Sequence, residues 1–132
     1  MPDIVAFLKE RIDEEEEIAR RAAFGWGAEW KVKDPGDDWA CIAAEGSLNV
    51  ASSEDIDVIR HACRWDPARV LAEIAAKRAI LAADPARGAR SYLDDVTAFA
   101  LAAWERTLLV LVQPFASHPD FDPAWESRAD GS

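Results

Sequence analysis

The hydrophobic residues of this chain change their spacing twice, and this change limits the folds that the chain can adopt. Apolar residues recur every three or four positions over residues 3–23, which is typical of an amphipathic helix. Apolar and polar residues alternate over residues 26–33, which is typical of a half-buried strand. Helical spacing returns after Ser52 and continues to Val112. The sequence therefore predicts an α+β fold that is mostly helical, with about four helices and a small sheet.

The predicted sheet is an antiparallel three-stranded meander between the first and the second helix. Its expected strands are residues 26–33, 39–43 and 47–51. Turn-forming residues separate these strands at 34–38 and at 45–46, where proline, glycine and acidic residues gather.

Three further helices are expected after the sheet, beginning near Ser52, at Pro67 and near Ser91. Asp66 precedes Pro67 as a predicted N-cap, and proline is well tolerated at the first helical position. Apolar and small residues spaced three and four apart mark one side of the last helix. They are Leu93, Val96, Ala100, Ala103 and Thr107. Residues 108–112 are apolar all round, which indicates that this end of the helix is surrounded by protein.

The length of 132 residues favours one domain over two, and half of the residues are hydrophobic, so the chain can bury a core. We expect a single domain over residues 1–132, in which residues 1–114 form the core. Residues 115–132 form a tail rich in aromatic residues and proline, with Phe115, Phe121 and Trp125 available to pack back on the core. The last few residues are expected to be frayed.

The sequence predicts a cytoplasmic protein that does not enter a membrane. The beginning of the chain lacks the basic and apolar regions of a secretory signal. The longest apolar segment, residues 96–112, is interrupted by Glu105 and Arg106 and is too short to be a membrane span. Cys41 and Cys63 are expected to be free thiols in a reducing compartment.

The formal net charge of −10 argues against direct nucleic-acid binding, which needs a basic surface. The charge is uneven, since residues 1–55 hold 14 acidic and 6 basic side chains, whereas residues 56–112 hold 7 and 8. Residues 113–132 hold 4 acidic side chains and 1 basic one. An acidic N-terminal half and tail therefore flank a mildly basic helical centre, which favours complementary docking within or between subunits.

Basic and aromatic side chains are the candidate interaction residues, because exposed tryptophan beside arginine is typical of protein interfaces. The basic candidates are Arg60, Arg64, Arg69, Lys77 and Arg78. The aromatic candidates are Trp26, Trp30 and Trp39.

Catalytic and metal-binding patterns are weak. Cys41, His61, Cys63 and His118 are zinc-ligand types, but none stands in a paired ligand spacing. The chain has no nucleophile elbow and no glycine-rich phosphate loop. Acid pairs at i,i+3 on two helices could hold Mg²⁺. These are Glu14 with Glu17, and Glu54 with Asp57. No cofactor is expected.

Three segments carry a family resemblance: residues 61–73 (HACRWDPARVLAE) with residues 76–81, the opening residues 4–8 before an acidic run, and residues 115–121 with Trp125. Together they resemble a family of small uncharacterised proteins, a domain of unknown function, from actinobacteria and their phages. One departure is Trp65, where the family pattern often carries a second histidine, so a two-histidine metal site is not implied here. The resemblance implies a host context and no assigned activity.

The sequence as a whole favours a non-catalytic protein-interaction domain of actinobacterial or phage origin that self-associates. Its partner would be another protein or a second copy of the chain. One alternative is an acidic decoy that occupies a nucleic-acid-binding partner by presenting carboxylates in place of phosphates. The other alternative is a Mg²⁺-dependent hydrolase built on the acidic cluster.

Overall fold

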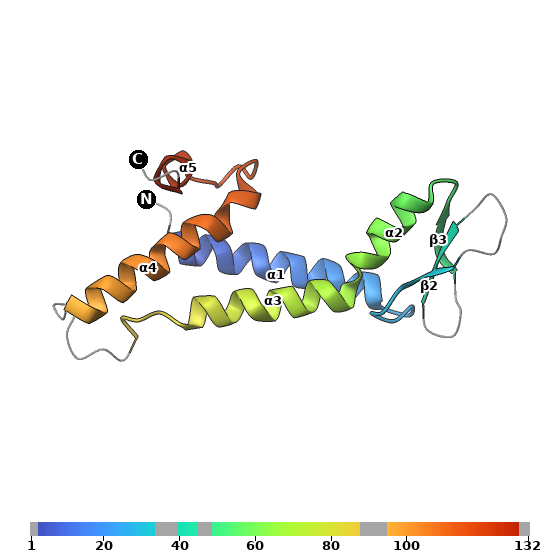
Figure 1. Cartoon of the computed structure of the whole chain (residues 1–132), viewed down its shortest axis with the longest axis horizontal. Coiled ribbons are helices and arrows are strands. Elements are labelled where there is room, and N and C mark those ends of the chain that lie inside the picture. The colour runs from blue at the N-terminus through green and yellow to red at the C-terminus, as the bar shows by residue number, and fades with distance from the viewer. Residues whose placement is uncertain (1–2, 34–39, 45–48, 88–94, 130–132) are drawn as a thin grey trace. The chain divides into compact units, whose positions relative to one another are not determined.

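The computed structural model describes residues 3–33, 40–44, 49–87 and 95–129 of the chain. Over these residues the fold is α+β, with a three-stranded sheet between the first and the second helix (Figure 1). The elements are α1 (Ile4–Ala23), β1 (Lys31–Lys33), β2 (Ala40–Ala43), β3 (Asn49–Ser53), α2 (Ile56–Arg64), α3 (Pro67–Ala82), α4 (Asp95–Val112), the 3₁₀ helix η2 (Gln113–Phe115) and α5 (Pro123–Ala129). None of the described helices is long and apolar enough to cross a membrane.

Contacts divide the chain into two compact units. The sheet unit is Asp13–Ala75, and the tail unit is Met1–Ile12 together with Ala76–Ser132. Helices α1 and α3 each contribute one end to each unit.

The sheet of the sheet unit has the order β1-β2-β3, and both pairings are antiparallel. Val32 pairs with Ile42 across the first pair of strands, and Ile42 pairs with Ala51 across the second. Helix α2 packs on this sheet (Figure 1), where Ala40, Ile42 and Ile59 form a buried cluster. The antiparallel order of the three strands confirms the predicted meander. Alternate residues of β2 are buried, because their side chains point toward a helix.

The first strand is shorter than the alternating pattern predicted. Gly25 and Gly27 have φ angles of 78° and 87°, and the Gly27 N–H donates to the Ala23 carbonyl at 2.8 Å. These glycines close the end of α1 in a conformation that is accessible to glycine and unfavourable to other residues. The chain therefore becomes extended only at Lys31. The predicted turns at 34–38 and 45–46, and the frayed end at 130–132, lie outside the described residues.

The second helix begins later than the sequence predicted. Strand β3 continues to Ser53, and α2 starts at Ile56. The N-cap is Asp55, whose carboxylate accepts the backbone N–H of Asp57 at 2.9 Å. The prediction of a helix start near Ser52 was wrong, because this capping carboxylate sets the boundary three residues further on.

Asp66 connects two parts of the sheet unit. Its Oδ1 accepts the Arg69 N–H at 2.9 Å, which confirms the predicted N-cap of α3. Its Oδ2 accepts the Trp30 N–H at 3.0 Å, and the Trp30 indole N–H donates to the Gly27 carbonyl at 3.1 Å. One carboxylate thus caps a helix and holds the segment that enters the sheet.

The core of the tail unit contains an aromatic cluster around Phe7 of α1. The Phe7 ring centroid lies 5.1 Å from that of Trp125 and 6.3 Å from that of Phe121. Trp125 is 1% exposed, although the short helix α5 that carries it was not predicted. Phe115 also contacts the Phe7 ring, with centroids 6.2 Å apart. The tail aromatics therefore cover the first turns of α1.

Helix α4 buries a different side from the one that its sequence spacing marks. Leu108, Leu109 and Val112 are buried, and the Trp104 indole N–H donates to the Ile80 carbonyl at 2.7 Å. On the marked side, Val96 is 75% exposed, Ala103 and Thr107 are exposed, and Ala100 is half-buried. Leu93 and the predicted helix start near Ser91 lie outside the described residues.

The prediction that residues 108–112 are surrounded by protein was wrong on one face, since Val110 is 62% exposed. Residues 108–112 are apolar on every side of α4, but the tail unit packs against only one of these sides.

Candidate interaction surfaces

The outer face of α4 carries a continuous row of side chains with alternating spacings of three and four residues. We call this row the outer α4 stripe; it consists of Val96, Phe99, Ala103, Arg106 and Val110. Phe99 is 80% exposed. Alternating three- and four-residue spacing is typical of the seam between two packed helices. The stripe therefore has the pattern of a packed face while lying in solvent.

A cavity of about 520 Å³ lies on this same face of α4. It is lined by Phe99, Ala102, Ala103, Arg106, Thr107 and Val110. The two alanines are the smallest of these side chains and lie between Phe99 and Val110 along the helix. The face is thus hollow at its centre and apolar toward both ends.

The predicted basic residues divide between the two units. Arg60, Arg64 and Arg69 belong to the sheet unit and are exposed. Lys77 and Arg78 belong to the tail unit, where the Lys77 Nζ lies 5.9 Å from the Phe115 ring centroid. The predicted basic ridge therefore spans two separate units.

Two of the sheet-unit arginines interact with acids of their own helices. Arg60 lies 3.6 Å from the Asp57 carboxylate, and Arg69 lies 3.3 Å from that of Glu73. The Arg69 guanidinium also stacks over the Trp65 ring, 4.2 Å from its centroid. Arg69 was predicted as an interaction residue and Trp65 was not, although their spacing of four residues could have indicated the contact.

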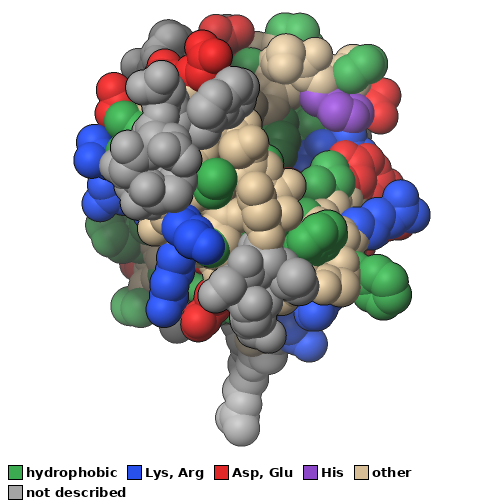
Figure 2. Space-filling model, turned by 90° about the vertical axis from the view of Figure 1, so that its right-hand side faces the viewer, with side chains coloured by type: hydrophobic (Ala, Val, Ile, Leu, Met, Phe, Trp, Pro, Cys, Tyr) green, Lys and Arg blue, Asp and Glu red, His purple; other side chains and the backbone are tan. Residues whose placement is uncertain are grey.

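The predicted tryptophans have different surroundings. Trp26 is 41% exposed, whereas Trp30 packs against the buried cluster of the sheet unit. Trp39 lies outside the described residues. Figure 2 shows the face on the side of the sheet, where basic, acidic and hydrophobic side chains are interspersed. The described residues on this face form no large patch of a single charge.

The acidic residues considered as magnesium ligands are spread over the sheet unit. Glu14 and Glu17 lie on α1, Glu54 precedes α2, and Asp57 lies in its first turn. Among the described residues, no three His, Cys, Asp or Glu side chains come close enough together to hold a metal ion. The zinc-ligand types Cys41, His61, Cys63 and His118 are all described residues, so none of them belongs to such a group.

Two i,i+4 ion pairs are present on α1. Glu16 lies 3.4 Å from Arg20, and Glu17 lies 2.7 Å from Arg21. Their i,i+4 arrangement offsets the repulsion between neighbouring acidic side chains of this helix.

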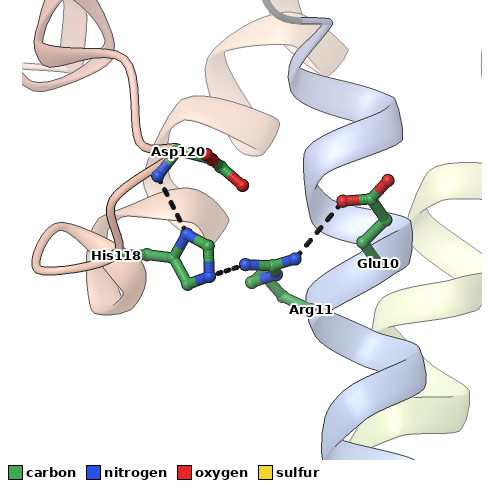
Figure 3. Close-up of polar contacts among 4 residues, drawn as sticks. All are labelled: Glu10, Arg11, His118 and Asp120. Atoms are coloured by element: carbon green, nitrogen blue, oxygen red, sulfur yellow. Dashed lines mark hydrogen bonds and ion pairs between the residues drawn. The ribbon is translucent and has the colours of Figure 1, made fainter.

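A polar contact joins the tail to α1 in the tail unit (Figure 3). The guanidinium of Arg11, which is 5% exposed, contacts Nε2 of His118 and lies 5.0 Å from the Phe7 ring centroid. Arg11 also pairs with Glu10 at 3.3 Å. His118 Nδ1 accepts the backbone N–H of Asp120 at 3.1 Å, which orients the imidazole (Figure 3). The contact therefore fixes residues 118–120 beside α1.

From the sequence, His118 was predicted only as a zinc-ligand type, and no role was predicted for Arg11. The two residues are 107 positions apart, so no local pattern connects them. A signal existed for Arg11, because it follows Phe7 by four residues on the apolar side of α1. A charged residue on such a side needs a polar partner.

A second cavity, of about 590 Å³, lies beside the aromatic cluster and has acidic residues in its lining, Asp3, Glu10, Asp120 and Asp122. Two of these carboxylates serve as helix caps. Asp3 accepts the Val5 N–H at 2.9 Å, and Asp122 accepts the Ala124 N–H at 2.9 Å. The acidic lining is thus explained in part by the starts of α1 and α5.

Both described cysteines are free and half-buried. Cys63 packs against the buried cluster of the sheet unit. Burial raises the pKa of the Cys63 thiol above its usual value of 9.0, and the nearby Asp66 carboxylate raises that pKa further. A raised pKa lowers the fraction of reactive thiolate, so the Cys63 environment is unlike that of an activated nucleophile.

Together these features define a small α+β protein with an exposed apolar helix face and no metal cluster among the residues that the structure describes. The chain belongs to the family of unknown function DUF6221, whose sequence profile matches residues 1–127. This confirms the resemblance to a family of uncharacterised proteins. No curated protein and no solved structure matches the chain.

Proposed function

We propose that this protein is a non-catalytic interaction domain that associates with a second copy of itself. The observation that carries the proposal is the exposure of the outer α4 stripe. Val96, Phe99 and Val110 are 75%, 80% and 62% exposed, on a helix whose other side is already packed. Exposed apolar surface of this kind marks interaction sites on soluble domains.

The composition of α4 supports the same conclusion. Of its 18 residues, only Asp95, Glu105 and Arg106 are charged. A helix that is apolar on both sides is normally covered on both sides. The tail unit covers one side of α4, so a partner is needed for the other.

The free energies involved point to weak association. Burying a fully exposed Val or Phe side chain contributes about 1.5–3 kcal/mol. Because Val96, Phe99 and Val110 are 75%, 80% and 62% exposed, burying the remaining exposed area on two copies supplies roughly 6–13 kcal/mol. The loss of translational and rotational freedom costs about 4–15 kcal/mol. The free energy gained by burial and the free energy lost on association are therefore nearly equal. A dimer held by this surface alone therefore forms and dissociates with protein concentration.

The charge of the chain affects this association in a defined direction. Two copies with a net charge of −10 repel each other, whereas the outer α4 stripe contains only Arg106 as a charged residue. Added salt screens the repulsion and leaves the apolar contact in place. Self-association should therefore strengthen with salt, while an acidic decoy would bind its basic partner less well as salt increases.

We also place the protein in the cytoplasm of an actinobacterium or of a cell infected by an actinobacterial phage. The segments that resemble that family support the source. The free state of Cys41 and Cys63 supports a reducing compartment.

The experiment that tests self-association is the molar mass measured by light scattering from low to high micromolar concentration. The wild-type chain should change from monomer to dimer across this range. Phe99→Glu should weaken the dimer roughly a thousandfold, because each of the two copies loses a buried aromatic contact of about 2 kcal/mol.

Val58→Glu is the matched control, since Val58 is a 55% exposed helical valine in the sheet unit. It should dimerise as the wild type does. A wild-type chain that stays monomeric throughout the range would overturn the proposal, as would a dimer that Phe99→Glu leaves unchanged.

A further inference from the structure

We propose that the two copies pair through antiparallel α4 helices, with the two-fold axis passing beside Ala103. This inference rests on the proposed self-association and adds its geometry. It assigns a central position to Ala103 and the outer positions to Val96 and Val110.

Val96 and Val110, the two ends of the outer α4 stripe, are placed symmetrically about Ala103. Val96 and Val110 lie seven residues before and after it, and Phe99 and Thr107 lie four residues before and after it. A two-fold axis at Ala103 therefore places Val96 opposite the partner's Val110 and Phe99 opposite the partner's Thr107. A two-fold interface requires such a self-complementary surface.

The sizes of the side chains fit this arrangement. Phe99 would enter the partner's copy of the cavity of about 520 Å³, which Ala102 and Ala103 leave open. Small residues at the crossing point allow two helix axes to approach closely. A parallel pair would instead place the two Phe99 rings at one level and two alanines at the next, which leaves alternating crowded and empty layers.

The charges on α4 also favour the antiparallel direction. Asp95 and Arg106 are eleven residues apart, which places them within about 20° of each other around the helix. Asp95 therefore lies on the flank of the stripe where Arg106 stands, and in an antiparallel pair equal flanks face each other. Each Arg106 then faces the flank that carries the partner's Asp95. The opposed helix dipoles add a further favourable term, whereas parallel dipoles would repel.

Disulfide trapping tests this geometry in the full-length chain. Cys41→Ser and Cys63→Ala first remove the native thiols. Ala103→Cys in this background should then give a covalent dimer under mild oxidation, because the two new thiols would lie next to the two-fold axis.

Two end variants determine the direction of the helices. In the antiparallel pair, the two copies of position 96 lie about 21 Å apart, which is the length of fourteen helical residues, and the same holds for the two copies of position 110. Val96→Cys and Val110→Cys should therefore each fail to form a disulfide between two copies of the same variant. An equimolar mixture of the two variants should give the mixed covalent dimer. Circular dichroism of each variant before oxidation verifies that it is folded.

The possible outcomes separate this inference from the proposed function. A thiol-free chain that is monomeric by light scattering would overturn both. A dimeric chain in which Val96→Cys links to itself would overturn only the antiparallel geometry. A dimeric chain in which neither Ala103→Cys nor the mixture links would show that the dimer uses another surface.

Discussion

Two apolar helix faces in the tail unit have opposite surroundings. The Phe7 side of α1 is covered by Phe121 and Trp125, and Phe7 itself is 4% exposed. The outer side of α4 has the same helical spacing, yet its aromatic residue, Phe99, is 80% exposed. The difference lies in whether the chain provides its own cover. A covered face contributes to the stability of the monomer, whereas an uncovered face is available for association.

The covered face has several features that bring the tail back to α1. The 3₁₀ helix η2 follows α4 directly, and the Gln113 side-chain N–H donates to the Trp125 carbonyl at 3.2 Å. Asp122 caps α5, and His118 contacts the buried Arg11. No comparable segment among the described residues returns over the outer α4 stripe.

The largest effect is expected from a substitution in the covered face of α1. Trp125→Ala should reduce the free energy of unfolding by about 3–5 kcal/mol, because it removes a buried aromatic side chain and leaves a cavity. Urea denaturation followed by circular dichroism measures this change. Phe99→Ala, at a concentration where the chain is monomeric, should change the free energy by less than about 0.5 kcal/mol. Equal losses in the two variants would remove the distinction between the two faces.

A smaller effect should come from the polar contact that holds the covering loop. His118→Ala should reduce the free energy of unfolding by about 1–3 kcal/mol, since Arg11 is buried and loses a polar neighbour. Asp120→Ala is the matched control, because it leaves intact the backbone N–H that His118 accepts. If both variants are equally stable by the same urea experiment, the tail is held by its aromatic contacts alone.

The sequence predicted most of the features that depend on neighbouring residues. The Asp66 cap and the meander between two helices were both found. Each depends on side chains within a few positions or on a repeating pattern.

The features that the sequence did not predict depend on distant parts of the chain. The spacing of Val96 and Ala103 marked a side of α4, but spacing does not state whether that side is covered. The contact between Arg11 and His118 joins the two ends of the chain, so it follows only from the fold. For the same reason, Trp30 was predicted in a strand although the Asp66 carboxylate holds it outside the sheet.

The smallest predicted effect concerns the covered side of α2 in the sheet unit. Cys63 lies on the covered side of this helix, against the cluster that contains Ile59. Burial, and then the Asp66 charge, raise the pKa of this thiol. At mildly alkaline pH, iodoacetamide should therefore modify Cys63 several-fold more slowly than an unfolded reference peptide of the same local sequence. The Cys41→Ser variant isolates the reaction, and mass spectrometry measures its rate.

The same thiol gives a pH dependence of stability with a definite sign. Folding raises the pKa of Cys63, so the folded chain holds this proton at pH values where the unfolded chain has released it. The stability contribution is complete below the pKa of the unfolded thiol and decreases as the pH rises above it. Cys63→Ala should reduce the loss of stability across this alkaline range in urea experiments. An unchanged loss, together with a reference-like alkylation rate, would show that this side of α2 is as accessible as the outer face of α4.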